Sequence, residues 1–200
     1  MPPGVDYKSL HPAFAEPVQD AQKTFRALLE AMSQPTRIVA LDVELRAPAP
    51  LHSAAAAICL TLLDLETQLW TDLDVDAAAL GWLRFHCGCP LVSQAGCADF
   101  ALAIDCHKMP RIEQFHQGLP EYPERSTTLI VQVRRLTGNG GRVFRGPGID
   151  SASRLTVDGL PEYFWAGWQK QAMEYPLGVD VVFVCGDSLA ALPRTTWIED

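Results

Sequence analysis

The densest group of potential metal ligands in the sequence lies between residues 86 and 107. It contains two histidines and four cysteines: His86, Cys87, Cys89, Cys97, Cys106 and His107. Structural zinc sites usually combine two Cys-x₂₋₄-Cys or His-x₃₋₅-His knuckles. Here Cys87 and Cys89 are separated by one residue and no second knuckle follows, whereas free cysteine is among the most frequently buried residue types. We therefore expect buried thiols and no bound metal.

Scattered arginines, histidine and glycines are the second kind of candidate. Gly146 and Gly148 form a glycine turn that could present backbone N–H groups to a phosphate. Arg84 and His86 stand two residues apart near a predicted helix end, where they could bind an anion or complement the helix dipole. Arg194, which follows a proline, allows the same two interpretations. These five residues are the candidate ligand-binding set, and the structural alternative stays open for each.

No motif for covalent or phosphate-transfer chemistry is present. Gly-x-Ser-x-Gly and Ser-x-x-Lys are absent, and the glycine-rich stretch 138–141 lacks the lysine of a Walker loop. That stretch is most simply a hairpin turn between strands 129–136 and 142–144. Asp64 and Glu66 could hold magnesium or act as an acid/base pair, but a helix end leading into a turn is the simpler interpretation. Catalytic residues stay unassigned.

Length and composition indicate one globular domain. The chain has 200 residues, of which 48% are hydrophobic and 20% charged, as is usual for a globular fold. Residues 1–10 carry two prolines and a glycine, and we expect a flexible tail there, followed by a single domain over residues 11–200. Met1–Leu10 lacks the apolar core of a signal peptide, so we expect a cytoplasmic protein with reduced thiols.

Charge and hydropathy argue against two classes of partner. The formal net charge is −8, and a negative chain without clustered lysines or arginines repels nucleic-acid phosphates. The longest apolar run, Ser53–Leu63, is about half as long as a bilayer-spanning helix. We therefore expect neither nucleic acid nor a membrane as a partner.

The hydrophobic pattern predicts alternating helices and strands. The clearest helix lies between Pro17 and Pro35, where an apolar stripe recurs at helical spacing: Val18, Ala21, Phe25, Leu28, Leu29 and Met32. Further helices are expected at 52–63, 75–86, 111–117 and 160–173, and strands at 38–45, 67–71, 100–104, 129–133, 142–144 and 181–185. Fully apolar strands between helices favour an α/β fold, with a mixed sheet covered by helices on both faces.

Several segments, taken in chain order, resemble one protein family. They are His11–Phe14, Pro17–Gln22, Phe25–Met32, Thr61–Asp64 with Glu66–Thr67, Leu83–His86, Pro90–Val92, Gly146–Ile149, Pro176–Asp180 and Leu192–Thr196. This ordered set resembles PhnH, the family of H subunits of the bacterial carbon–phosphorus lyase system for phosphonate use. The chain departs from the family pattern at Pro35-Thr36, where Pro-Gly is common, and at Tyr175, where Phe is usual.

The resemblance implies a fold similar to the large domain of pyridoxal-phosphate-dependent transferases, without that or any other cofactor, and a homodimer. It implies as partners the carbon–phosphorus lyase subunits G, I and J. The first step of that system, the α-D-ribose 1-methylphosphonate 5-triphosphate synthase step, transfers ribose 5-triphosphate from ATP to an alkylphosphonate and releases adenine. The family places the chemistry on subunits I and J, so this chain is expected to be structural or accessory and not catalytic alone.

Two further expectations concern how such a subunit contributes. The alternative to a structural role is a phosphate- or nucleotide-binding subunit that supplies pocket residues to the synthase step. A docking surface for the partners is expected to include exposed apolar residues near Trp165 or Trp168 on the late helix, because aromatic residues are enriched at interfaces.

Overall fold

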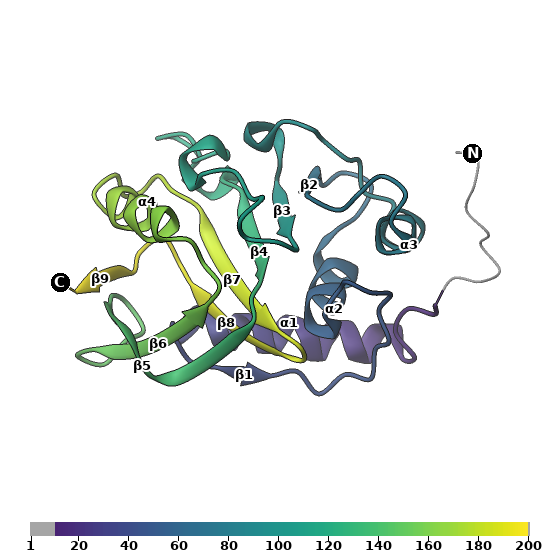
Figure 1. Cartoon of the computed structure of the whole chain (residues 1–200), viewed down its shortest axis with the longest axis horizontal. Coiled ribbons are helices and arrows are strands. Elements are labelled where there is room, and N and C mark those ends of the chain that lie inside the picture. Colours follow the sequence, from purple (N-terminus) through teal and green to yellow (C-terminus); the bar gives the residue numbers. More distant parts are fainter. Residues whose placement is uncertain (1–10, 200) are drawn as a thin grey trace.

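A six-stranded sheet forms the centre of the protein. A computed structural model describes residues 11–199, and the flexible tail predicted for residues 1–10 lies outside them. The strand order is β1-β8-β7-β4-β3-β2 (Figure 1), made by Val39–Ala40, Ser188–Leu192, Asp180–Cys185, Thr128–Gln132, Phe100–Ala103 and Leu69–Thr71. Strands β2, β3, β4 and β7 run parallel, whereas β8 and β1 are antiparallel to their neighbours. The predicted mixed sheet is confirmed.

Three helices cover one face of this sheet. They are α1 (Pro17–Ser33), α2 (Ser53–Leu62) and α3 (Ala78–His86). The alanine-rich α2 is buried from Ala54 to Cys59, because its small side chains let the helix lie close to the strands. Val182 and Val184 of β7 point into this layer, while the alternate residues Val181 and Phe183 point into the other.

The opposite face carries one helix and a second sheet. Helix α4 (Glu162–Ala172) packs there with the three-stranded antiparallel sheet β6-β5-β9, formed by Ser153–Asp158, Arg135–Arg145 and Trp197–Glu199. The 3₁₀ turn η3 (Ile112–Gln114) joins this layer, and two others, η2 (Ala95–Cys97) and η4 (Pro123–Arg125), lie in loops. Helices therefore lie on both faces, but α4 shares its face with a sheet that the sequence did not predict. No helix in the range 11–199 is long and apolar enough to cross a membrane.

The hairpin turn predicted at Gly138–Gly141 is wrong. Strand β5 continues through this stretch and pairs with β6 on both sides of it, with a shift of register between Thr137 and Arg142. Gly141 has φ +66, and a Cβ there would lie 2.4 Å from the carbonyl oxygen of Leu155. The glycines therefore form an irregularity within a strand. The hairpin turn is residues 146–152, between β5 and β6.

Other boundaries differ because local sequence does not determine strand pairing. Only Val39–Ala40 of the predicted strand 38–45 pairs with a neighbour. The predicted short helix 111–117 is reduced to the 3₁₀ turn Ile112–Gln114, and α3 begins at Ala78 instead of residue 75. The predicted strand 142–144 is only the last part of β5, which begins at Arg135. The remaining predicted helices and strands are confirmed to within a few residues at each end.

Candidate functional site

The five candidate residues fall into two separate groups. Arg84 and His86 lie in the last turn of α3. Gly146, Gly148 and Arg194 lie around the β5–β6 hairpin turn and the loop between β8 and β9. Figure 1 shows α3 at one end of the molecule and β9 with α4 at the other. The structure therefore brings together three of the five residues and not all of them.

Arg194 is held by a half-buried ion pair with Asp180. Its Nη2 donates to Asp180 Oδ2 at 2.5 Å, its Nε donates to Oδ1 at 3.2 Å and its backbone N–H donates to Oδ1 at 2.8 Å. Its Nη1 also donates to the carbonyl oxygen of Pro123. These contacts tie the start of β7, the loop after β8 and η4 together. Because Asp180 already neutralises the guanidinium, a ligand anion would have to compete for it.

The two glycines are required by close packing of the hairpin turn. A Cβ on Gly148 would lie 2.3 Å from the carbonyl oxygen of Ser33, at the end of α1. A Cβ on Gly146 would lie 2.8 Å from the carbonyl oxygen of Thr195, and both glycines have positive φ. The sequence interpretation as a phosphate-binding turn stays a prediction, while the packing supplies a sufficient reason for glycine at both positions.

The arginines that flank this turn are already paired. Arg145 donates to Glu199 at 2.7 Å and to the carbonyl oxygen of Ser151 at 2.6 Å. Arg142 pairs with Glu162 at 2.5 Å. A phosphate at the turn would therefore meet backbone N–H groups but few uncommitted cations.

A shallow groove lies beside the hairpin turn. It has a volume of about 520 Å³, and its lining includes Met32, Pro147, Gly148, Tyr175 and Arg194. Half of the lining residues are apolar or proline, and the lining also includes the carboxylates of Glu124 and Asp180. Two carboxylates beside Arg194 suit contact with another protein segment better than recognition of a small anion.

His86 holds the beginning of the described chain in place. Its Nε2 lies 3.1 Å from the carbonyl oxygen of His11, which also accepts a hydrogen bond from Trp82 Nε1 at 2.8 Å. Arg84 is exposed, and no carboxylate of the described residues forms an ion pair with it. An anion-binding role for this pair stays a prediction.

The cysteines are mostly buried and protonated. Burial and, to a smaller extent, the neighbouring Cys89 raise the pKa of Cys87 to about 12. Burial also raises the pKa values of Cys59, Cys89 and Cys106. A thiol with a raised pKa is a poor nucleophile and a poor metal ligand at neutral pH. Within residues 11–199, no three His, Cys, Asp or Glu side chains converge as metal ligands would.

A docking surface near Trp165 or Trp168 stays a prediction, but neither tryptophan is itself exposed. Trp165 is 6% exposed and Trp168 is 0% exposed, because both rings pack beneath the second sheet with Phe144, Phe164 and Phe183. Aromatic residues enriched in interfaces are equally suited to a core, and their helical spacing alone does not distinguish the two.

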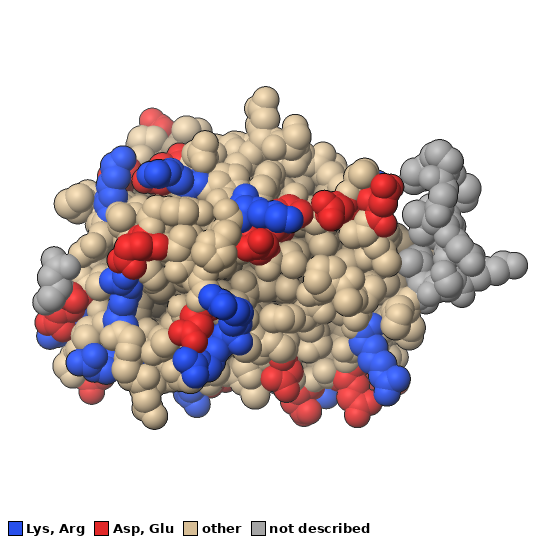
Figure 2. All heavy atoms as spheres, in the orientation of Figure 1, with Lys and Arg blue, Asp and Glu red and all other residues tan. Residues whose placement is uncertain are grey.

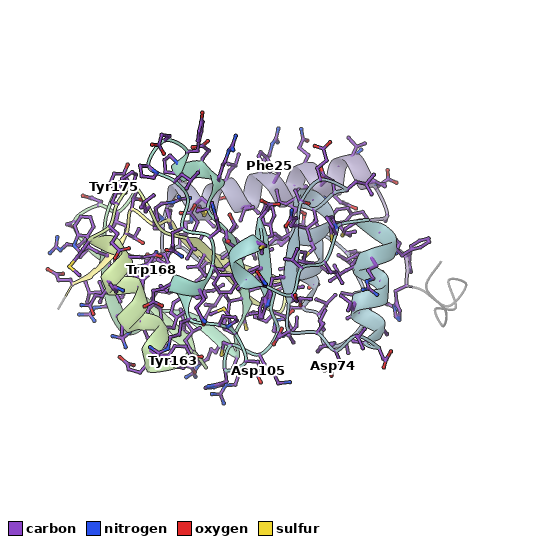
Figure 3. All side chains as sticks on the ribbon, turned by 90° about the horizontal axis from the view of Figure 1, so that it is seen from above. Phe25, Asp74, Asp105, Tyr163, Trp168 and Tyr175 are labelled. Carbon is purple, nitrogen blue, oxygen red and sulfur yellow. The ribbon has the colours of Figure 1, made fainter. Side chains whose placement is uncertain are left out.

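Helix α1 carries a row of exposed apolar side chains. Val18, Phe25 and Leu29 are 84%, 45% and 52% exposed, although the sequence placed them in the same apolar stripe as Leu28, which is buried. Met32 continues this row into the groove beside the hairpin turn. Figure 3 shows Phe25 and Tyr175 along the same side of the molecule. We name the row Val18, Gln22, Phe25 and Leu29 the α1 face.

A second cavity was missed by the sequence reasoning. It lies where β3, β4 and β7 end, and its lining includes Asp105, Cys106, His107, Arg134 and Gly186. A usable signal was present, because polar residues or glycine directly follow each predicted strand, and ligands of open α/β sheets bind outside the carboxyl ends of the strands. In the sequence, Cys106 and His107 stand out only as potential metal ligands.

Comparison with known proteins places the chain in one family. A family model described as bacterial phosphonate metabolism protein (PhnH) matches residues 12–199. The α-D-ribose 1-methylphosphonate 5-triphosphate synthase subunit PhnH of Rhizobium meliloti is 36% identical over 188 residues, which cover 94% of each chain. The putative C-P lyase subunit protein HtxG of Stutzerimonas stutzeri is 31% identical over 186 residues, covering 88% of this chain and 85% of the relative. The chain belongs to the PhnH family of bacterial phosphonate metabolism proteins.

Proposed function

We propose that this protein is an accessory subunit of a carbon–phosphorus lyase complex in phosphonate catabolism. In this role it is required for the transfer of ribose 5-triphosphate from ATP to an alkylphosphonate, alongside subunits G, I and J. Two relatives that match most of the chain are both named as subunits of such enzymes, and this observation carries the proposal. The assembly operates in the cytoplasm, and the fold is that of a transferase large domain without pyridoxal phosphate.

An accessory role is favoured over a supply of phosphate-binding residues to the synthase step. Arg194 is the positively charged candidate in the groove, and its guanidinium already donates hydrogen bonds to Asp180 and to the carbonyl oxygen of Pro123. Gly146 and Gly148 are needed for packing. The α1 face, in contrast, leaves about half or more of each apolar side chain exposed and suits a protein partner.

Reconstitution tests the accessory role directly. Subunits G, I and J with this chain should release adenine from ATP and methylphosphonate, and omission of this chain should abolish that turnover. The measurement is adenine release by chromatography, with co-purification of the subunits as the assembly control. Full adenine release without this chain would contradict the proposal.

The α1 face suits a second copy of the same chain. Its residues follow the spacing 18, 22, 25 and 29, which is symmetric about the midpoint of the row. An antiparallel α1 pair around a two-fold axis would therefore place Val18 against Leu29 of the other copy and Phe25 against Gln22. Self-complementarity of this kind is what an isologous dimer interface requires.

Replacing Phe25 by aspartate should convert the dimer to a monomer. The change introduces two charges at the centre of the symmetric contact, one from each copy, where desolvation and like-charge repulsion both oppose association. Light scattering after size-exclusion chromatography measures the mass. Val75→Asp is the control, because Val75 is also apolar and exposed but lies outside α1. A monomeric wild-type protein, or a Phe25→Asp variant that keeps the dimer mass, contradicts the proposal.

A further inference from the structure

The cavity at the ends of β3, β4 and β7 has the features of a ligand site. These strands are parallel neighbours, so their carboxyl ends open at one edge of the sheet. The cavity has a volume of about 490 Å³, and the residues that directly follow the three strands contribute to its wall. This edge is the usual ligand position in open α/β sheets, and none of the five candidate residues lies there.

Arg134 supplies an uncommitted positive charge to this cavity. The adjacent Arg135 pairs with Asp158 at 2.6 Å, whereas no described carboxylate forms an ion pair with Arg134. The Arg134 side chain lies along Gly159, where a Cβ would be 3.3 Å from its Nε. Its charge also lowers the pKa of Cys106, against the larger effect of burial. Cys106 lines the same cavity, so the guanidinium is close to the cavity wall.

His52 supplies an oriented hydrogen-bond donor at the same wall. The backbone N–H of Gly186 donates to His52 Nδ1 at 3.1 Å, so the neutral ring carries its hydrogen on Nε2. The backbone N–H of His52 donates to Gln132 Oε1 at 2.7 Å, and Gln132 Nε2 donates to Pro50 at 3.0 Å. Because Gln132 is buried, the backbone and the ring of His52 are each fixed, and Nε2–H is the remaining donor of the ring.

The other polar groups at this edge are occupied by the backbone. Ala54 N–H and Ser53 Oγ both donate to the carbonyl oxygen of Gly186, at 3.1 and 3.2 Å. Asp72 accepts from the N–H groups of Ile104 and Asp105 at 2.7 and 2.8 Å. Asp105 accepts from the N–H of His107 at 3.0 Å. The backbone groups at the start of α2 are thus partly used in hydrogen bonds. Arg134 and His52 keep donors for a ligand, and the exposed ring of His107 also lines the cavity.

We propose that this cavity binds the phosphoryl group of a small monophosphorylated molecule between the Arg134 guanidinium and His52 Nε2–H. Guanidinium and imidazole N–H groups are strong, directional donors to phosphate oxygens. The carboxylates of Asp72 and Asp105 lie at the same edge and repel additional negative charge. They therefore favour a single phosphoryl group over a polyphosphate chain.

The site stays accessible in the proposed dimer. Figure 3 shows Asp105, at this cavity, on the opposite side of the molecule from Phe25 of the α1 face. Acidic and basic side chains are interspersed on the face shown in Figure 2, without a continuous basic patch. Binding of an anion therefore depends on local donors such as Arg134 and not on a general positive surface.

Titration calorimetry of the full isolated chain with inorganic phosphate tests this site. We expect saturable binding with Kd on the order of 1 mM, as a few charge-assisted hydrogen bonds provide. Arg134→Ala should weaken binding at least about tenfold, and His52→Ala should weaken it as well. Arg134→Lys, which keeps the charge but loses the planar fork, should lie between Arg134→Ala and the wild type. Arg135→Ala is the matched control, since Arg135 is already paired, and it should bind like the wild type.

A spectroscopic measurement separates ligand contact from a structural role. The Nε2 signal of His52 in ¹⁵N-labelled protein should shift when phosphate is added, and the shift should be absent in Arg134→Ala. Absence of saturable phosphate binding overturns the proposal. Equal losses of phosphate affinity in Arg134→Ala and Arg135→Ala also overturn it, and so does tighter binding of ATP than of a monophosphate. The assay needs no partner subunit, so its outcome is independent of the proposed place in a lyase complex.

Discussion

Replacing Arg194 by alanine is expected to lower the free energy of unfolding by about 3 kcal/mol. The side chains of Arg194 and Asp180 are only 13% and 15% exposed, so the substitution leaves a largely desolvated carboxylate without its partner. The hydrogen bond to Pro123, which fixes η4, is lost in the same step. Urea denaturation followed by far-ultraviolet circular dichroism measures the change, with an unaltered m value as the sign of a two-state transition.

An exposed ion pair of the same composition provides the control. Arg135 and Asp158 are 66% and 37% exposed, and Arg135→Ala should change stability by less than about 1 kcal/mol. Asp180→Ala, measured alone and together with Arg194→Ala, should reveal a coupling energy for the half-buried pair. If Arg194 served mainly to hold a ligand, its replacement would leave the free energy of unfolding nearly unchanged, and the structural interpretation would be wrong.

The core elements could be predicted because their signals are local. The buried strands Thr128–Gln132 and Asp180–Cys185 are continuous apolar runs, and α1 begins at Pro17 as its sequence indicates. Strand β9 could not be predicted in this way, since it gains its place by pairing with β5 from a distant part of the chain. Strand β6 gains its place by pairing with β5 across the turn 146–152. The glycines at 138–141 gave a misleading turn signal for the same reason: only the pairing with β6 shows that they interrupt a strand.

The candidate site was harder to predict than the fold. The sequence offered both Arg194 and Gly148 as candidates, and the structure brings these two to one groove. The partner of Arg194, Asp180, is fourteen positions away in the chain and is found only through the fold. Arg134 and Arg135 look alike in the sequence. Only the geometry shows that Arg135 pairs with Asp158, whereas no carboxylate of residues 11–199 forms an ion pair with Arg134. The exposure of Phe25 on an otherwise ordinary amphipathic helix also depends on which face the sheet covers.

The burial of Trp168 predicts a second large loss of folding stability. Trp168→Ala is expected to cost about 3–5 kcal/mol, the usual range for removing a large aromatic side chain from a core. The ring is fully buried, stacks on Phe164 with centroids 6.3 Å apart, and donates from Nε1 to the carbonyl oxygen of Thr196 at 3.2 Å. Thermal and urea unfolding measure the loss. Trp168→Phe keeps much of the packing and loses the hydrogen bond, so a smaller loss of about 1–2 kcal/mol is expected.

Trp197 is a comparison residue that helps to distinguish a core role of Trp168 from a docking role, because Trp197 is half exposed in β9. Trp197→Ala should cost less than about 1.5 kcal/mol, since much of its surface stays in water. Co-purification with the partner subunits supplies the second readout. Near-native stability of Trp168→Ala combined with loss of the complex would restore Trp168 to an interface. Loss of stability with retained assembly at low temperature is the expected result, because a ring beneath the second sheet can stabilise this subunit but cannot touch another one.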